Sequence, residues 1–219
     1  MLGAYDSIRV INLVHRHDRR REMEEQLRRA HLTARFFQAC RPDNAGPFRT
    51  VGEHGVFASH LAVLKEALAE RQSVLILEDD CDFTREASKL RPPSDILWGG
   101  FSIHGDYIQG AHCLGFQAAT VARLVPFLER LLVDDPTPID GAYFRFCRDN
   151  PDIRVDACVP PVAVQRPSHS DISERRGLDR FPLARPLVSL LRRVKRHLQQ
   201  RKVGGSFDEL RRAESKKAQ

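Results

Sequence analysis

The 219-residue sequence predicts an α/β fold, with a doubly wound and mostly parallel sheet that is flanked by helices and followed by a basic helical tail. Strand-like and helix-like segments alternate through the first part of the chain, as they do in proteins built on parallel sheets. The segment 73–77 (SVLIL) is apolar over nearly its whole length. Such a strand suits the middle of a sheet that helices cover on both faces.

The first predicted strand is Ser7–Leu13, where β-branched residues give way to polar ones. A helix follows, which Asp18 can cap. Its apolar stripe consists of Met23, Leu27 and Ala30. Ala34–Gln38 is the second strand, and the segment 41–55 is rich in Gly and Pro, which predicts a loop.

The next helix has an apolar stripe made by Phe57, Leu61, Leu64 and Leu68. After the 73–77 strand, the second half is less regular. Strands are expected at 96–101, 113–118, 153–158 and 162–165, and helices at 121–132 and 139–147. Pro126 lies inside the first of these helices, where it removes a backbone donor, so a kink or a fresh helix start is expected there.

Charge divides the chain into two regions. Residues 185–219 carry 11 Lys and Arg against 3 Asp and Glu, whereas residues 1–184 carry 24 against 26. We therefore expect a domain over 1–184 and a basic amphipathic tail over 185–219. A nearly neutral body argues against nucleic-acid binding by the domain. Because no secretory signal or apolar span is visible, the expected location is the cytoplasm.

Three adjacent carboxylates, Glu78, Asp79 and Asp80, follow the apolar 73–77 strand directly. Adjacent acids at a partly buried strand end repel each other and lose hydration, and a divalent cation is the usual compensation. Ligands of open α/β sheets bind at the carboxyl ends of the strands, which is where these acids are expected. Mg²⁺ or Mn²⁺ bound there could bridge a nucleotide diphosphate. The alternative is a solvated acidic turn.

Several segments, in order, resemble glycosyltransferase family 25. They are Val10–Leu13 with Asp18-Arg19-Arg20, Gly52-Glu53 with Gly55 and Ser59-His60, Leu75–Asp80 (LILEDD), Ile139-Asp140, and Ser170-Asp171-Ile172. The resemblance implies a GT-A-like fold and inverting transfer of galactose or a related hexose from a UDP-sugar donor. The implied acceptor is a saccharide or lipid-linked oligosaccharide of bacterial lipooligosaccharide, lipopolysaccharide or another cell-surface glycan.

Donor-side roles are expected for residues near the first and third strands. Asp80 is the first choice as metal ligand, with Glu78 beside it, because residues two apart share one face of a continuing strand. Asp79 could hold the ribose or the donor sugar. Guanidinium groups of Arg16, Arg19 and Arg20 suit phosphate oxygens, although Arg20 equally suits a solvated helix start. The resemblance adds Asn12, Glu53 and Ser59 as donor-binding residues.

The resemblance also offers Asp140 as the catalytic base, with a simple helix N-cap as the alternative. His60 is either an active-site donor or a core histidine with a local hydrogen bond. His169 could be a further metal ligand, or it could be a solvated loop residue.

Two other classes of function remain open at this stage. One is a non-catalytic basic adaptor that binds an anionic membrane or nucleic acid through its tail. The other is a metal-dependent nucleotidyl or phosphoryl transferase that uses the same acids. In the tail, Leu187, Leu190, Leu191, Val194 and Leu198 fall on one helical face with basic residues around it. We therefore expect either docking on an anionic membrane surface or packing on the enzyme body.

Overall fold

A computed structural model describes residues 5–89, 95–104, 107–158 and 161–166. His169, the Ser170–Ile172 segment, the domain boundary at 184 and the basic tail lie outside the described residues. The six-stranded sheet has the order β2-β1-β3-β6-β5-β7, and a separate ribbon joins β4 to β8. The strands are β1 (Ser7–Asn12), β2 (Arg35–Gln38), β3 (Val74–Glu78), β4 (Cys81–Phe83), β5 (Ile96–His104), β6 (Tyr107–Phe116), β7 (Val155–Ala157) and β8 (Ala163–Gln165).

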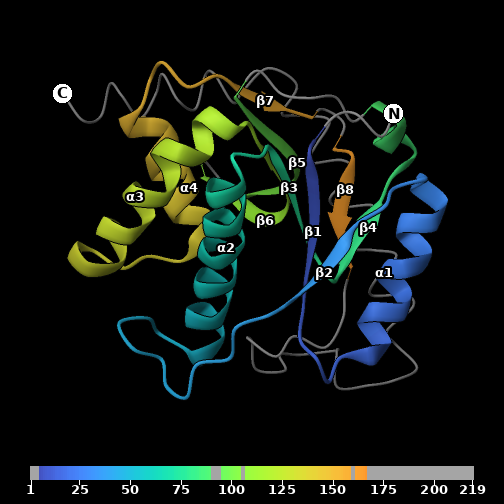
Figure 1. The fold of residues 1–219 in the computed structure, drawn as a ribbon, viewed down its shortest axis with the longest axis horizontal. Helices are drawn as coiled ribbons and strands as arrows, with labels where there is room; N and C mark the ends of the chain where they lie inside the picture. The colour runs from blue at the N-terminus through green and yellow to red at the C-terminus, as the bar shows by residue number, and fades with distance from the viewer. Residues whose placement is uncertain (1–4, 90–94, 105–106, 159–160, 167–219) are drawn as a thin grey trace.

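The sheet is mixed but mostly parallel, as expected. The pairs β1–β2, β1–β3 and β5–β7 are parallel, and only β6 runs against both of its neighbours. The helices are α1 (His17–Ala30), α2 (Val51–Glu70), α3 (Ala118–Asp134) and α4 (Ile139–Asp149), with a short 3₁₀ turn at Arg85–Lys89. Figure 1 shows α2, α3 and α4 on one side of the sheet and α1 on the other.

The central strand β3 contributes to the hydrophobic core on both of its faces. Val74 and Ile76 pack with the cluster beneath α2, α3 and α4, whereas Leu75 and Leu77 pack with the cluster beneath α1. All four side chains are at most 1% exposed. The apolar run therefore reflects burial on two faces, because side chains alternate along a strand.

Two expectations for the helices were wrong. Asp18 does not cap α1: the N-cap residue is Arg16, and Asp18 lies in the first turn, where its carboxylate accepts hydrogen bonds from Arg16. The loop after β2 ends earlier than expected, because α2 begins at Val51 and includes Gly52 and Gly55. Of the two outcomes expected at Pro126, a fresh helix start does not occur, since α3 is one helix from 118 to 134, and a kink there stays a prediction.

The start of α2 has a local cause that the sequence contains. The Thr50 hydroxyl accepts from the backbone N–H of Glu53, and the Glu53 carboxylate accepts from the backbone N–H of Arg49. Thr followed three residues later by Glu is the usual pattern of a capped helix start. This signal outweighs the two glycines, which alone favour a loop.

The segment after β2 is attached to α2 through Gly55 and Ser59. The Ser59 hydroxyl accepts from the backbone N–H of Cys40 and donates to the carbonyl of Gly55. A Cβ at Gly55 would lie only 2.8 Å from the carbonyl oxygen of Cys40. This close approach fixes α2 against the end of β2. It thereby sets the position of His60, the residue that follows Ser59 in α2.

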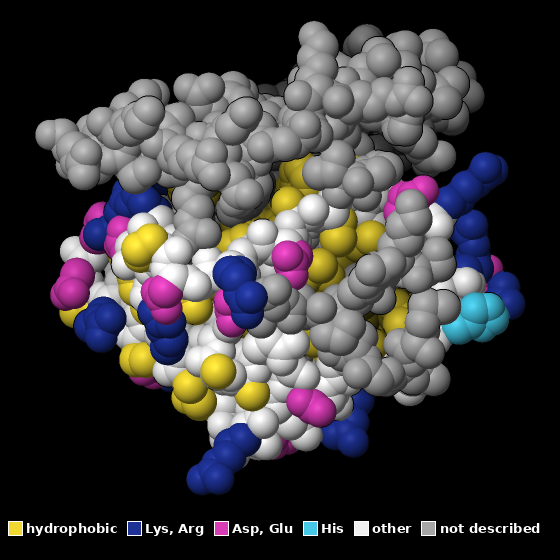
Figure 2. Space-filling view, turned by 90° about the horizontal axis from the view of Figure 1, so that it is seen from above, with side chains coloured by type: hydrophobic (Ala, Val, Ile, Leu, Met, Phe, Trp, Pro, Cys, Tyr) yellow, Lys and Arg dark blue, Asp and Glu magenta, His cyan; other side chains and the backbone are white. Residues whose placement is uncertain are grey.

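The described surface is mixed in charge, and Figure 2 shows basic and acidic side chains interspersed over the described part of one face. This agrees with the near neutrality of residues 1–184. No helix within the described ranges is both long enough and apolar enough to cross a membrane.

The contact between Gly55 and Cys40 can be tested by Gly55→Ala. An added methyl group would have to displace backbone, which costs roughly 1–3 kcal/mol and outweighs the ~1 kcal/mol that Ala gains over Gly in a helix. We expect a lower free energy of unfolding by urea denaturation. Gly52→Ala, in the first turn of the same helix, is the control and should be neutral or stabilising. A Gly55→Ala protein as stable as Gly52→Ala would contradict the account.

Candidate active site at the carboxyl ends of β1 and β3

The candidate site begins where two parallel strands end side by side. The β1–β3 register pairs Ile11 with Glu78, so that Asn12 and Asp79 follow at the same edge of the sheet. The amide of Asn12 donates to Asp79 at 2.8 Å. Both residues are buried. This hydrogen bond joins the carboxyl ends of β1 and β3. Ligands of open α/β sheets bind at such strand ends.

Arg19, from the first turn of α1, balances the charge of the acids. Its guanidinium donates to Asp79 at 2.7 Å and lies 3.4 Å from a carboxylate oxygen of Asp80. The side chains of all three residues are at most 11% exposed. Because removing one partner of a buried ion pair leaves an uncompensated charge, this contact fixes α1 to the edge of the sheet.

Asp80 has a buried oxygen atom that its neighbours do not satisfy. Its Oδ2 atom faces Arg19 and the Gln165 amide, each at 3.4 Å, but its Oδ1 atom has no hydrogen-bond partner among the described residues. Burial and the neighbouring Glu78 carboxylate raise the pKa of Asp80 to about 7, although Arg19 acts in the opposite direction. A buried carboxylate oxygen without a partner calls for an explanation, and a bound cation or water is one.

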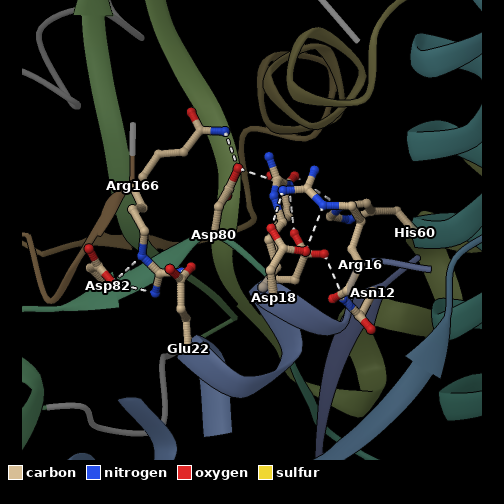
Figure 3. Close-up of polar contacts among 12 residues, drawn as sticks. Asn12, Arg16, Asp18, Glu22, His60, Asp80, Asp82 and Arg166 are labelled. Atoms are coloured by element: carbon tan, nitrogen blue, oxygen red, sulfur yellow. Dashed lines mark hydrogen bonds and ion pairs between the residues drawn. The ribbon is translucent and has the colours of Figure 1, made fainter. Parts of the chain in front are cut away.

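Glu78 contacts a different part of the site from Asp79 and Asp80. Strand β3 ends at Glu78, and the next two residues form a turn, so the expectation that Glu78 and Asp80 share one strand face was wrong. Glu78 lies 3.5 Å from Nε2 of His60 on α2, whereas Asp79 and Asp80 contact Arg19 on α1. In Figure 3, His60 lies at one edge of the residues drawn, whereas Asp80 lies nearer their middle.

His60 is a core residue and also contacts a site acid. It is completely buried, and its Nδ1 atom lies 2.9 Å from the hydroxyl of Tyr143 on α4. The core position expected as one alternative is confirmed, but the hydrogen-bond partner is distant in sequence and not local. A role for His60 as an active-site donor remains a prediction. Tyr143 itself was not recognised from the sequence, because an aromatic residue at helical spacing usually indicates core packing alone.

Asp140 lies in the first turn of α4, one turn before Tyr143, but it is not the N-cap, which is Pro138. Its carboxylate accepts from the backbone N–H of Gly141 at 2.9 Å. Burial raises the pKa of Asp140, and the negative charge of Glu78 raises it further. The fold thus brings Asp140 within electrostatic range of the LILEDD acids, although more than 60 residues separate them in sequence.

Strand β8 closes the site on the side of α1, and its residues were missed by sequence reasoning. Besides the Gln165 contact, the backbone N–H of Arg166 donates to the carbonyl of Asp80 at 2.6 Å. The Arg166 guanidinium binds Asp82 and Glu22, as Figure 3 shows. A short strand late in the chain carries no motif that reveals which strand it pairs with. Only the β4–β8 pairing in the structure places Gln165 and Arg166 beside Asp80.

Other residues with an expected donor role make local contacts. Arg16 pairs with Asp18, and Arg20 pairs with Glu24 and lies over the ring of Phe36. Glu53 and Ser59 make the contacts at the start and middle of α2 described above. A donor-binding role for these residues remains a prediction.

A cavity of about 930 Å³ lies beside the edge strand β2 and α2, away from the acids. It is lined by Arg9, Arg35, Phe36, Phe37, Gln38, Ala39, Cys40, Arg41, Glu66 and Glu70. Of its lining residues, Ala39 donates its backbone N–H to the carbonyl of Asn12. The chemistry therefore points to the strand ends and not to this cavity.

The side chains at the strand ends could supply one carboxylate ligand, Asp80, to a divalent cation. Within the described ranges, no group of three or more His, Cys, Asp or Glu side chains is arranged to hold a metal. Mg²⁺ and ions like it are usually held by one or two carboxylates together with substrate phosphates and water. The unpartnered Oδ1 atom of Asp80 meets that requirement.

No family model matches the sequence, and no curated protein matches it. Among solved structures, the fold is similar to that of a glycosyltransferase involved in the glycosylation of the major capsid of PBCV-1 (TM-score 0.53, 12% identity, covering 75% of this chain and 93% of that chain). Two further matches are weaker. They are 4-diphosphocytidyl-2C-methyl-D-erythritol synthase from Anaerococcus prevotii (TM-score 0.41, 12% identity, 84% and 78%) and CTP:phosphocholine cytidylyltransferase from Streptococcus pneumoniae (TM-score 0.36, 11% identity, 84% and 78%). The chain therefore shares its fold, at low sequence identity, with a glycosyltransferase.

Proposed function

We propose that this chain is a metal-dependent, inverting glycosyltransferase that moves a hexose from a UDP-sugar to a saccharide hydroxyl. The observation that carries the proposal is the buried Asp80 carboxylate, which lies at the carboxyl ends of two parallel strands and has one oxygen without a partner among the described residues. The shared fold and the LILEDD resemblance support a nucleotide-sugar donor. The acceptor we propose is lipooligosaccharide, lipopolysaccharide or another cell-surface glycan.

In this proposal Asp80 is the protein ligand of Mn²⁺ or Mg²⁺. The bound ion would offset the charge on the departing diphosphate. Asn12 and Arg19 hold Asp79 in place through hydrogen bonds of 2.8 and 2.7 Å, so the turn that carries Asp80 keeps its conformation. His169 remains a proposed additional ligand from outside the described residues.

Asp140 is the proposed base for the acceptor hydroxyl. An inverting transfer is one displacement, in which the acceptor oxygen bonds to the anomeric carbon as the bond to the diphosphate breaks. The hydroxyl proton must then pass to a nearby group. Because burial raises the Asp140 pKa, its carboxylate is a stronger base than a solvated one. Asp140 belongs to α4 and Arg19 to α1, and these helices lie on opposite sides of the sheet, so the scheme separates the base from the donor phosphates.

Metal dependence is tested by Asp80→Ala. With UDP and Mn²⁺ at about 100 times the dissociation constant, the wild-type melting temperature should rise by roughly 5–10 °C. The variant should lose the Mn²⁺-dependent part of this rise in melting temperature. It should also no longer release UDP from a UDP-sugar in the activity assay. Asp134→Ala, an exposed acid at the end of α3, is the matched control and should behave as wild type. Wild-type activity in excess chelator would sink the proposal, and pyrophosphate release from a nucleoside triphosphate would favour a nucleotidyltransferase.

The raised pKa of Asp80 predicts how stability depends on pH in the metal-free protein. Between the ordinary value of about 4 and about 7, the folded state holds a proton on Asp80 that the unfolded state has lost. The contribution of Asp80 to stability therefore falls as pH rises through this window. In chelator, Asp80→Asn should melt several degrees above wild type at pH 8, and the difference should shrink towards pH 4. A difference that grows as pH falls would have the wrong sign.

The role of Asp140 is tested by Asp140→Asn. An amide cannot take up the acceptor proton, so turnover should fall roughly a hundredfold or more while the affinity for UDP-sugar stays near wild type. Initial rates at saturating donor and titration calorimetry measure the two quantities. A large loss of donor affinity with unchanged turnover would make Asp140 a binding residue.

A further inference from the structure

A buried polar chain connects α4, α2 and the end of β3. The Tyr143 hydroxyl lies 2.9 Å from Nδ1 of His60, and Nε2 of His60 lies 3.5 Å from Oε1 of Glu78. Tyr143 is 2% exposed and His60 is completely buried, whereas the Glu78 side chain is 22% exposed. The chain therefore begins in the core and ends at the part of the site that is open to solvent.

The hydrogen-bonding capacity of the three groups gives this chain a direction. A carboxylate only accepts, so the His60 nitrogen that faces Glu78 carries a hydrogen. In a neutral ring the other nitrogen is then an acceptor, and Tyr143 donates to it. With a charged ring, both nitrogens would donate, and the Tyr143 hydrogen would be buried without an acceptor, which is costly. His60 is the sole hydrogen-bond partner of Tyr143 among the described residues.

We propose that Tyr143, acting through His60, positions the Glu78 carboxylate to accept a hydrogen bond from a hydroxyl of the donor hexose. Tyr143 and His60 are positioning residues, and Glu78 is the group that touches the sugar. At 3.5 Å the contact is longer than a hydrogen bond, and Nε2 of His60 has no hydrogen-bond partner among the described residues, so the ring attracts the carboxylate electrostatically and leaves its oxygens able to accept from the sugar.

Two further observations support a sugar-binding role for Glu78. Within the described part of the chain, His60 is the one side chain in polar contact with its carboxylate, so its other oxygen has no protein partner. Asp140, the proposed base, lies one turn from Tyr143 on α4 and is electrostatically coupled to Glu78. The site thus has a phosphate side at Asp80 and Arg19, and a sugar side at Glu78 and Asp140.

This inference rests on the proposed function, but its first test does not need enzyme activity. In ¹⁵N-histidine-labelled protein, NMR should show His60 as the neutral tautomer with hydrogen on Nε2. Tyr143→Phe removes the donor to Nδ1, so the Nδ1 resonance should shift, while Nε2, which still faces Glu78, should keep its hydrogen. Tyr5→Phe, which removes another buried hydroxyl, is the control and should leave His60 unchanged. A wild-type His60 that is charged, or protonated only on Nδ1, would overturn the proposal.

The second test compares UDP with UDP-galactose by titration calorimetry in Mn²⁺. Tyr143→Phe and Glu78→Gln should weaken UDP-galactose binding by roughly 3- to 10-fold, the scale of one lost hydrogen bond, and leave UDP binding unchanged. His60→Gln keeps an N–H donor and should retain more UDP-galactose affinity than His60→Leu. Equal losses for UDP and UDP-galactose would overturn the positioning role. Wild-type protein that binds neither ligand would instead contradict the proposed function.

Discussion

The buried ion pair between Arg19 and Asp79 is the contact on which the rest of the site depends. It joins the first turn of α1 to the end of β3, and Asn12 completes it from the end of β1. Three elements therefore meet at one carboxylate. With Asp79 neutralised in this way, the turn can carry the adjacent Asp80 in a buried position, where an unpartnered oxygen and a raised pKa are tolerated. In the proposed reaction, Asp80 can bind the metal because Asp79 is already paired with Arg19.

The end of β3 also divides the acids by function. While the strand lasts, even-numbered residues face α2 and α4 and odd-numbered residues face α1. Glu78 follows this alternation and contacts His60, but the chain then turns, and both Asp79 and Asp80 contact Arg19. One short motif thus supplies a sugar side and a phosphate side in the proposed reaction. The arrangement explains why three adjacent carboxylates can coexist at a partly buried position.

Much of this could be predicted from the sequence, because burial on both faces makes β3 apolar and local patterns locate most strands and helices. The sequence spacing of Glu78 and Asp80 did not predict that they contact different helices. That outcome depends on where β3 ends, and the neighbouring strands determine this point. The Asp18 cap failed because the Arg16 guanidinium occupies that carboxylate. The start of α2 was predictable from Thr50 and Glu53, yet the glycines favoured a loop. Tyr143 and Arg166 carry no local signal, and only tertiary packing brings them to the site.

The most direct test of this account is the position of the metal in a crystal grown with Mn²⁺ and a nucleoside diphosphate. Anomalous scattering distinguishes Mn²⁺ from water and from lighter ions directly. The account predicts one strong peak bonded to the Oδ1 atom of Asp80 and to diphosphate oxygens, with the Arg19–Asp79 pair intact and Glu78 turned towards His60. A peak at Glu78 and His60 without Asp80, or a diphosphate bound with no metal at Asp80, would contradict it.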